Sequence, residues 1–157
     1  MAEELSYRAE AAAEYDRAFS HVSAYFVPFL LRAARLGPGQ RVLDVATGTG
    51  IAAEAALRVV GADGSIVATD LSPEMVEKAR QRLDKASNAF VAVEDGQALS
   101  LPDEGFDVVL CSLGLMFFPD PLRGLFEFRR VLRPGGRAPS LFKPHRTAPT
   151  TAGSMLS

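Results

Sequence analysis

The sequence predicts a single α/β domain built on a doubly wound sheet of five mainly parallel strands. Short apolar runs typical of buried strands alternate with amphipathic stretches typical of helices through residues 41–136. A glycine turn, Gly48-Thr49-Gly50, directly follows the first apolar run, and Asp70 closes the second run twenty residues after the turn. Because the carboxyl ends of parallel strands meet at one edge of a sheet, we expect the turn and Asp70 to lie side by side.

Residues 6–36 are rich in alanine and are expected to be helical. Their large apolar residues recur at steps of three and four, which predicts one apolar helix face. That face comprises Tyr15, Phe19, Val22 and Phe26. Pro28 predicts either a kink or the first turn of a second helix. We assign residues 1–36 to an N-terminal helical lid.

The alternation of strands and helices begins after this lid. Strands are expected at residues 41–45 and 65–69, with a helix at 51–60 between them. These segments form one βαβ unit of the length that a right-handed parallel crossover requires. Two further strands are expected at 89–93 and 106–112.

Two later helices carry clear start signals. Ser72 is expected to cap a helix that opens with Pro73 and runs to about Lys85. Its apolar face should comprise Val76, Ala79 and Leu83, with a Glu74–Lys78 pair on the exposed side. Asp120-Pro121 starts another helix by the same logic. The inward residues expected for this last helix are Leu122, Leu125, Phe126, Val131 and Leu132.

The regular pattern ends near residue 136. Arg133-Pro134-Gly135-Gly136 is expected to end the last helix. Pro139 then interrupts the fifth apolar run, which predicts a weak or edge strand at most. We assign residues 37–142 to the ligand-binding domain and residues 143–157, a mixture of Pro, Thr and Ser, to an irregular tail.

The composition favours a small-molecule ligand. The 157 residues carry 17 basic and 19 acidic side chains, a formal charge of -2 that gives no basis for binding nucleic acid. The start lacks the basic region of a signal peptide, and the apolar run 24–31 is too short to span a bilayer, so we expect a cytoplasmic protein. The single cysteine, Cys111, excludes an internal disulfide and a cysteine metal cluster and indicates a buried structural thiol.

Three carboxylates near expected strand ends point to a nucleoside ligand, namely Asp44, Asp70 and Asp95. Gly48 and Gly50 remove side chains where the backbone must approach a ligand closely. Asp70 is placed to accept hydrogen bonds from two ribose hydroxyls, and Asp95 from an adenine amine. Simpler alternatives stay open here: Asp70 as a capping or turn residue, and Asp95 as a loop residue that bonds its own backbone.

Two cofactor classes fit this arrangement, a nicotinamide dinucleotide and S-adenosylmethionine. Asp44 favours the second, because a carboxylate just ahead of the turn would repel a pyrophosphate and attract the ammonium and sulfonium groups of S-adenosylmethionine. The third glycine position of the dinucleotide fingerprint holds Ala53, a replacement that this fingerprint tolerates. The distinction therefore rests on Asp44.

These residues resemble the class I S-adenosylmethionine-dependent methyltransferases, and within them the ubiquinone/menaquinone and arsenite methyltransferase branch. Five segments carry the resemblance in the family's order and spacing: 42–50, 68–75, 94–97, 106–112 and 132–136. Ala46 stands where the family most often has the first loop glycine. The resemblance implies a Rossmann-like fold whose sheet has seven strands, and we expect the last two to be missing from this chain.

The resemblance also implies the site. The glycine loop would surround the methionine part of the cofactor, and the end of the second strand would hold the ribose. Leu71 and Met75 would pack against the adenine, the segment after the third strand would read the adenine edge, and the residues after the fourth strand would border the sulfur. The implied set is Asp44, Ala46, Thr47, Gly48, Gly50, Asp70, Leu71, Met75, Asp95, Gly96, Gln97, Ser112 and Leu113.

Methyl transfer from a sulfonium requires alignment and exclusion of water rather than a nucleophilic side chain, so we name no catalytic base and expect no metal. The acceptor is expected to be small and apolar or aromatic. Met116, Phe117 and Phe118 form either an apolar rim for it or loop-to-core packing. The alternative functions are cofactor binding without turnover and an NAD(P)-binding oxidoreductase. An exposed sheet edge would also allow a homodimer.

Overall fold

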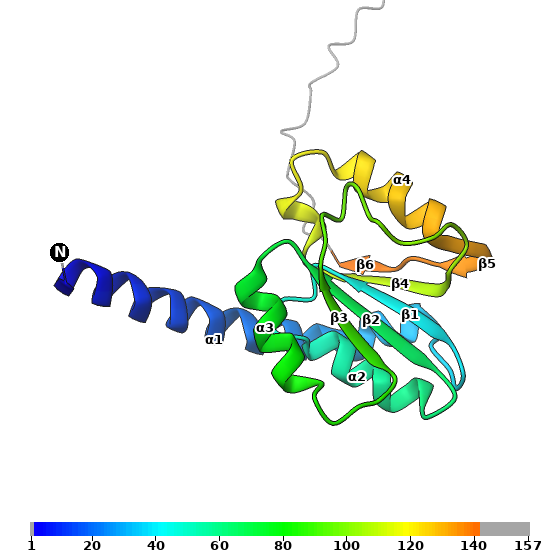
Figure 1. Cartoon of the computed structure of the whole chain (residues 1–157), viewed down its shortest axis with the longest axis horizontal. Coiled ribbons are helices and arrows are strands. Elements are labelled where there is room, and N and C mark those ends of the chain that lie inside the picture. Colours follow the sequence, from blue (N-terminus) through cyan, green and yellow to red (C-terminus); the bar gives the residue numbers. More distant parts are fainter. Residues whose placement is uncertain (1, 142–157) are drawn as a thin grey trace, which may run out of the picture.

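One sheet organises the chain, with parallel strands in the order β3-β2-β1-β4-β5 (Figure 1). The computed structural model describes residues 2–141, and the side chains of residues 17–140. The strands are β1 (Arg41–Val45), β2 (Ser65–Asp70), β3 (Ala89–Val93), β4 (Phe106–Ser112) and β5 (Leu132–Arg137). A two-residue strand, β6 (Ser140–Leu141), pairs with the end of β4. The predicted α/β fold with five parallel strands is confirmed.

The winding of the sheet reverses between β1 and β4. The chain moves outward from β1 through β2 to β3, then returns to form β4 on the other side of β1. Leu43, at the middle of β1, aligns with Val67 of β2 and with Val109 of β4. Ligands of open α/β sheets bind beyond the carboxyl ends of the strands at such a reversal.

Helices cover both faces of this sheet (Figure 1). One face carries α1 (Ala2–Ala33), α2 (Ile51–Val60) and α3 (Pro73–Arg82), and the other carries α4 (Pro121–Val131). A short 3-10 helix, η1 (Leu115–Phe117), lies between β4 and α4. Because both faces are covered, most residues of β1 and β4 are buried, as is typical of central strands of a parallel sheet.

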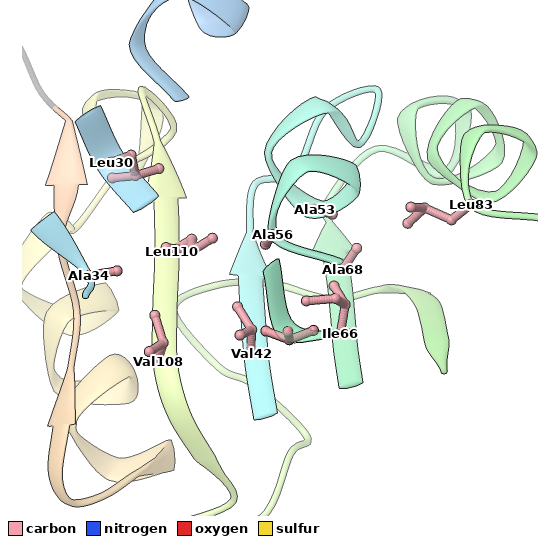
Figure 2. Close-up of a cluster of buried hydrophobic side chains, with 11 residues drawn as sticks. Leu30, Ala34, Val42, Ala53, Ala56, Ile66, Ala68, Leu83, Val108 and Leu110 are labelled. Atoms are coloured by element: carbon pink, nitrogen blue, oxygen red, sulfur yellow. The ribbon is translucent and has the colours of Figure 1, made fainter. Parts of the chain in front are cut away.

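The first hydrophobic core lies between the sheet and α1, α2 and α3 (Figure 2). Leu30 and Ala34 bring α1 onto the strands, where Val42, Ile66 and Val108 are fully buried. The α2 residues in this core are small: Ala53, Ala56 and Val60. Small side chains let α2 lie close to β1, which positions its N-terminus at the reversal.

The second hydrophobic core lies beneath α4. Phe128 and Val131 of α4 pack against Leu43 of β1 and Val109 of β4. Cys111 belongs to this core and is fully buried, which confirms the prediction of a structural thiol. Burial, the neighbouring Asp44 charge and the more distant Asp70 charge raise the pKa of this thiol to about 12, so it is protonated at neutral pH.

The helix α1 differs from the prediction in two ways. It continues through Pro28, which therefore does not open a second helix. Its buried residues near the sheet are Val27, Leu30 and Ala34, whereas Val22 and Phe26 of the predicted apolar face are exposed. Phe19 of the same predicted face is partly buried, so these residues do not share one buried side of α1. The Tyr15 side chain lies outside the described residues.

The helix α3 begins as predicted. The Ser72 hydroxyl accepts a hydrogen bond from the Met75 amide at 3.3 Å, and Val76, Ala79 and Leu83 are buried. The predicted Glu74–Lys78 pair is also present, at 3.6 Å. The helix ends at Arg82 rather than near Lys85, because Leu83 already has non-helical backbone angles.

The predicted inward face of α4 is wrong for its first three residues, whereas Val131 is buried as predicted. Leu122, Leu125 and Phe126 are exposed, with 67%, 42% and 67% of their surface accessible. The buried residues are Gly124, Phe128 and Val131, which share one face at steps of four and three. The Phe118 ring sets this choice, because a Cβ on Gly124 would lie 2.6 Å from it.

The chain passes from α4 into β5 without a connecting residue, since Val131 ends the helix and Leu132 begins the strand. The Pro134-Gly135-Gly136 segment, predicted to end α4, lies inside β5 and shifts its register against β4. Ala138 and Pro139 separate β5 from β6. The predicted weak fifth strand is therefore an irregular β5 followed by a short β6, and the predicted tail 143–157 lies outside the described residues.

Within residues 2–141, no helix has the length and hydropathy needed to cross a membrane.

Candidate cofactor site

A cavity of about 390 Å³ opens beyond the carboxyl ends of the central strands, where the winding reverses. Acidic side chains and the glycine loop form one part of its wall, and aromatic side chains form another. The lining comprises Phe19, Ser20, Ser23, Val45, Ala46, Thr47, Gly48, Thr49, Ile51, Ala52, Asp70, Leu71, Met75, Glu94, Asp95, Gly96, Gln97, Ser112, Gly114, Phe117, Phe118 and Pro119.

The glycine loop between β1 and α2 has an unusual backbone. Ala46, Gly48 and Gly50 all have positive φ angles, of 55°, 57° and 84°. At Gly48 a Cβ would meet nothing within 4 Å, so the glycine leaves open space beside the cavity. At Gly50 a Cβ would lie 3.2 Å from that of Ala79, so this glycine lets α3 approach the loop.

Asp70 ties the loop to the next strand. Its Oδ2 atom accepts a hydrogen bond from the Gly48 amide at 2.9 Å, and its Oδ1 atom accepts one from the Ser72 amide at 3.0 Å. The prediction that Asp70 lies beside the glycine turn is confirmed. Asp70 bonds turn amides, as the simpler interpretation predicted, and it also lines the cavity. Each carboxylate oxygen has a second lone pair with which to accept a ligand hydroxyl.

Asp95 lies across the cavity in the segment after β3. Its Oδ1 atom accepts hydrogen bonds from the Gln97 backbone amide at 2.9 Å and from the Gln97 side-chain amide at 3.3 Å. Its Oδ2 atom takes part in no hydrogen bond with the described residues. Asp95 therefore bonds its own backbone, as the simpler alternative required, and keeps one oxygen for a ligand.

Asp44 lies beneath the loop rather than in the cavity wall. It is fully buried, and the Thr47 hydroxyl donates a hydrogen bond to its Oδ2 atom at 2.6 Å. Its Oδ1 atom is buried and has no hydrogen-bond partner among the described residues. Burial raises the pKa of Asp44 to about 7, opposed by the Thr47 hydroxyl and the Ala53 amide and increased slightly by Asp70. Its charge therefore changes near neutral pH.

The end of β4 forms the floor of the cavity. The Ser112 hydroxyl is buried and has no hydrogen-bond partner among the described residues. Leu113 follows with a φ of 60°, which is rare for a residue with a branched side chain. Strained backbone thus occurs on both sides of the reversal, at Ala46 after β1 and at Leu113 after β4.

Aromatic side chains form the apolar wall. The Phe117 ring is 62% exposed and contacts the Phe19 ring of α1 edge to face, with centroids 6.4 Å apart. The Phe118 ring instead packs against Phe128 at 6.3 Å and covers Gly96. Both rings line the cavity, and Phe118 packs against the second core as well. Met116 is 43% exposed and does not line the cavity.

The structure brings most of the predicted site residues together. Ten of the thirteen line the cavity: Ala46, Thr47, Gly48, Asp70, Leu71, Met75, Asp95, Gly96, Gln97 and Ser112. The other three, Asp44, Gly50 and Leu113, lie just behind the lining. No group of three or more His, Cys, Asp or Glu side chains between residues 17 and 141 is arranged to hold a metal ion.

The sequence predicts α1 as part of a lid, but none of its residues is among the predicted site residues. Phe19, Ser20 and Ser23 line the cavity, although α1 is distant in sequence from every other part of the site. The only signal for Phe19 in the sequence was its place in the aromatic periodicity. That periodicity does not show which part of the fold the Phe19 side chain contacts. Glu94 was also missed, and its carboxylate accepts hydrogen bonds from the amide and the hydroxyl of Ser100.

Comparisons with known proteins agree on one family. A profile of the methyltransferase domain family matches residues 42–136. A protein of Mycobacterium tuberculosis, described only as uncharacterized, is 36% identical over 127 residues, which cover 80% of this chain and 45% of that protein. The demethylmenaquinone methyltransferase of Deinococcus radiodurans is 46% identical over 101 residues, which cover 62% of this chain and 41% of that enzyme.

A solved structure shows the same fold. The crystal structure of a SAM-dependent methyltransferase from Aquifex aeolicus superposes with a TM-score of 0.66 at 29% identity, covering 73% of this chain and 62% of that one. This chain spans less than half the length of the two relatives above. The matched segment contains the glycine loop, all three acidic residues and α4. By sequence and by fold, the chain belongs to the methyltransferase domain family.

Proposed function

We propose that this protein binds S-adenosylmethionine in the cavity at the β1/β4 reversal and transfers its methyl group to a small apolar or aromatic acceptor. One observation carries the proposal. Asp70 and Asp95 reach a single cavity from neighbouring strand ends, while Phe117 and Phe19 form an apolar wall of the same cavity. A cavity with one acidic wall and one apolar wall suits a nucleoside together with an apolar reaction partner.

The residues present suit the cofactor. Asp70 would accept hydrogen bonds from the ribose hydroxyls, and the free Oδ2 atom of Asp95 would accept one from the adenine amine. Leu71 and Met75, which line the cavity, would pack against the adenine ring. The open space at Gly48 would admit the methionine part beside the loop backbone.

Bound S-adenosylmethionine supplies a methyl group that its sulfonium has already activated. The task of the chain is to orient the cofactor and to keep water away from the reacting carbon. Phe19 and Phe117 exclude water on the apolar side. The Ser112 hydroxyl, which is buried and unpartnered among the described residues, can orient a polar atom at the floor of the cavity.

The structure offers a second argument against a dinucleotide. The Gly48 amide, which a pyrophosphate would need to approach in this loop, already donates to Asp70. A diphosphate placed there would face the Asp70 carboxylate directly. This repulsion is independent of the charge of Asp44, whose pKa of about 7 leaves it only partly ionised at neutral pH.

The acceptor class rests on the apolar wall and on the relatives. Demethylmenaquinone, named in the D. radiodurans relative, is the first acceptor to test. Calorimetry with S-adenosylhomocysteine and NAD⁺ should show binding of the first compound alone. Binding without product from demethylmenaquinone or a panel of phenols would leave a cofactor-binding domain without turnover. Binding of NAD⁺ in place of S-adenosylhomocysteine would overturn the proposal.

A further inference from the structure

The segment that carries Asp95 has no secondary structure of its own. Residues 94–105 connect β3 to β4 without a helix or a strand. Their internal hydrogen bonds are few and local: Glu94 with Ser100, Asp95 with Gln97, and the Ala98 amide with the Asp95 carbonyl at 2.9 Å. Such a segment needs contacts from outside to hold a side chain in one position.

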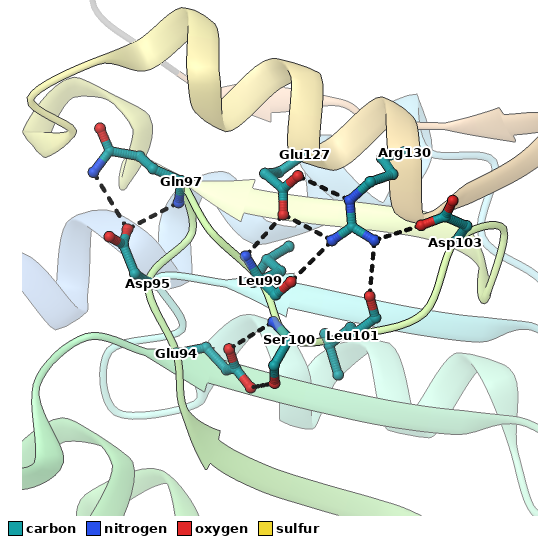
Figure 3. A network of polar contacts seen from close by, with 9 residues as sticks. All are labelled: Glu94, Asp95, Gln97, Leu99, Ser100, Leu101, Asp103, Glu127 and Arg130. Atoms are coloured by element: carbon teal, nitrogen blue, oxygen red, sulfur yellow. Dashed lines mark hydrogen bonds and ion pairs between the residues drawn. The ribbon is translucent and has the colours of Figure 1, made fainter.

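The Glu94 amide donates to the Asp70 carbonyl at 3.0 Å, and Leu99 is buried in the second core. The side-chain hydrogen bonds that hold the rest of the segment come from α4 and from Asp120, which caps it (Figure 3). At the start of α4, the Asp120 amide donates a hydrogen bond to Gln97 Oε1 at 2.7 Å. Further along α4, Glu127 Oε2 accepts a hydrogen bond from the Leu99 amide at 2.8 Å. The same Gln97 side chain also donates to Asp95, so it links α4 directly to the ligand-facing carboxylate.

Arg130 makes the largest number of these contacts. Its guanidinium donates to the carbonyls of Leu99 and Leu101, each at 2.9 Å, and to Asp103 Oδ1 at 2.6 Å. It also pairs with Glu127 through Nε at 2.8 Å and Nη2 at 2.7 Å. Arg130 lowers the pKa of Glu127, which keeps the pair ionised at neutral pH. Only a planar guanidinium supplies five donors in this geometry.

We propose that Arg130 and Glu127 are positioning residues for cofactor recognition: they hold residues 95–103 against α4 so that Asp95 presents its free oxygen to the adenine amine. This inference rests on the proposed function. It predicts that a change on α4, outside the cavity, alters selectivity for the purine 6-position. A role in stability alone would weaken every ligand equally and leave selectivity unchanged.

The test uses two ligands, S-adenosylhomocysteine and its hypoxanthine counterpart, in which a carbonyl replaces the 6-amino group. The wild-type chain should bind the adenine compound about tenfold more tightly, as expected for a hydrogen bond to a charged acceptor. Arg130→Met should lower this ratio to about 1–2, and Arg130→Lys should give an intermediate value. The matched control is Arg129→Met, because Arg129 is the adjacent, exposed arginine of the same helix and lies outside the network.

A double-mutant cycle gives the second readout. Asp95→Asn should itself remove the selectivity, and adding Arg130→Met to it should cause no further loss of selectivity. A wild-type ratio retained in Arg130→Met would overturn the inference even if the variant melts at a lower temperature. If Arg130→Met does not fold, a wild-type ratio in Arg130→Lys and Glu127→Gln would overturn it. Failure of the wild-type chain to bind either ligand would instead overturn the proposed function.

Discussion

Gly114 lies so close to Ala46 that a Cβ on Gly114 would be 2.4 Å from the Ala46 Cβ. The two residues follow β4 and β1, the strands between which the sheet reverses. Ala46 has a φ of 55°, a conformation that L residues adopt at a cost. The crevice at the reversal therefore depends on having no side chain at position 114 and only a methyl group at position 46.

We expect Gly114→Ala to destabilise the fold by about 2–3 kcal/mol, because a methyl group there forces the β1 and β4 loops apart. Thermal and urea denaturation measure the change. Gly37→Ala is the control, since a Cβ at Gly37 meets nothing within 4 Å and its φ is ordinary. Adding Ala46→Gly should recover most of the loss, and a double variant no more stable than Gly114→Ala would contradict this account.

The pKa of Asp44 predicts how stability depends on pH. Its value is about 7 in the folded chain and 3.8 in an unfolded one, so the folded chain binds the proton more tightly. The Asp44 contribution is therefore full below pH 3.8, falls by up to about 1.4 kcal/mol per pH unit between these values and is lost above about pH 7. The free energy of unfolding of wild type minus that of Asp44→Asn should follow this course. Parallel curves across this pH range would refute it.

Asp70→Asn should weaken binding of S-adenosylhomocysteine by about 1–3 kcal/mol. The amide cannot accept hydrogen bonds at both of its ends, so either the Gly48 or the Ser72 amide loses its partner along with the ribose. Calorimetry measures the affinity. Asp63→Asn changes the same functional group at an exposed turn and should leave binding unchanged. Equal affinities in the two variants would reject the placement of the ribose at Asp70.

Phe117→Ala should raise KM for an apolar acceptor about tenfold, because the ring supplies apolar area at the cavity. The ring is 62% exposed, so the free energy of unfolding should change by only about 0.5 kcal/mol. Phe126→Ala is the matched control, since Phe126 is 67% exposed on α4 and does not line the cavity. Kinetics with demethylmenaquinone provide the readout, and an unchanged KM would contradict the assignment.

The elements that sequence predicted well are those defined by local chemistry. Ser72-Pro73 and Asp120-Pro121 both start helices as predicted, because the cap and the proline act within one turn. The apolar face of α4 was wrong because three large residues, Leu122, Leu125 and Phe126, outweighed Gly124 in the pattern. The deciding contact is the Phe118 ring on Gly124, which depends on how the preceding loop folds.

In the site, too, local sequence predicted some features, whereas tertiary packing decided others. The acidic residues stand next to strand ends, so the parallel topology alone brings Asp70 to Gly48 and places Asp95 nearby. The burial of Asp44 was not foreseen, because the sequence does not show that Thr47 folds over it. The contribution of Phe19 depends on the direction in which α1 leaves the sheet, which no local pattern encodes.

Because α4 passes directly into β5, no loop residue is present at this junction to absorb an insertion or a deletion. One residue inserted between Val131 and Leu132 would either turn the helix by about 100° or reverse which β5 side chains face the core. A turn of the helix would carry Arg130 away from the carbonyls of Leu99 and Leu101. Natural variation in length is therefore expected to be absent at this junction.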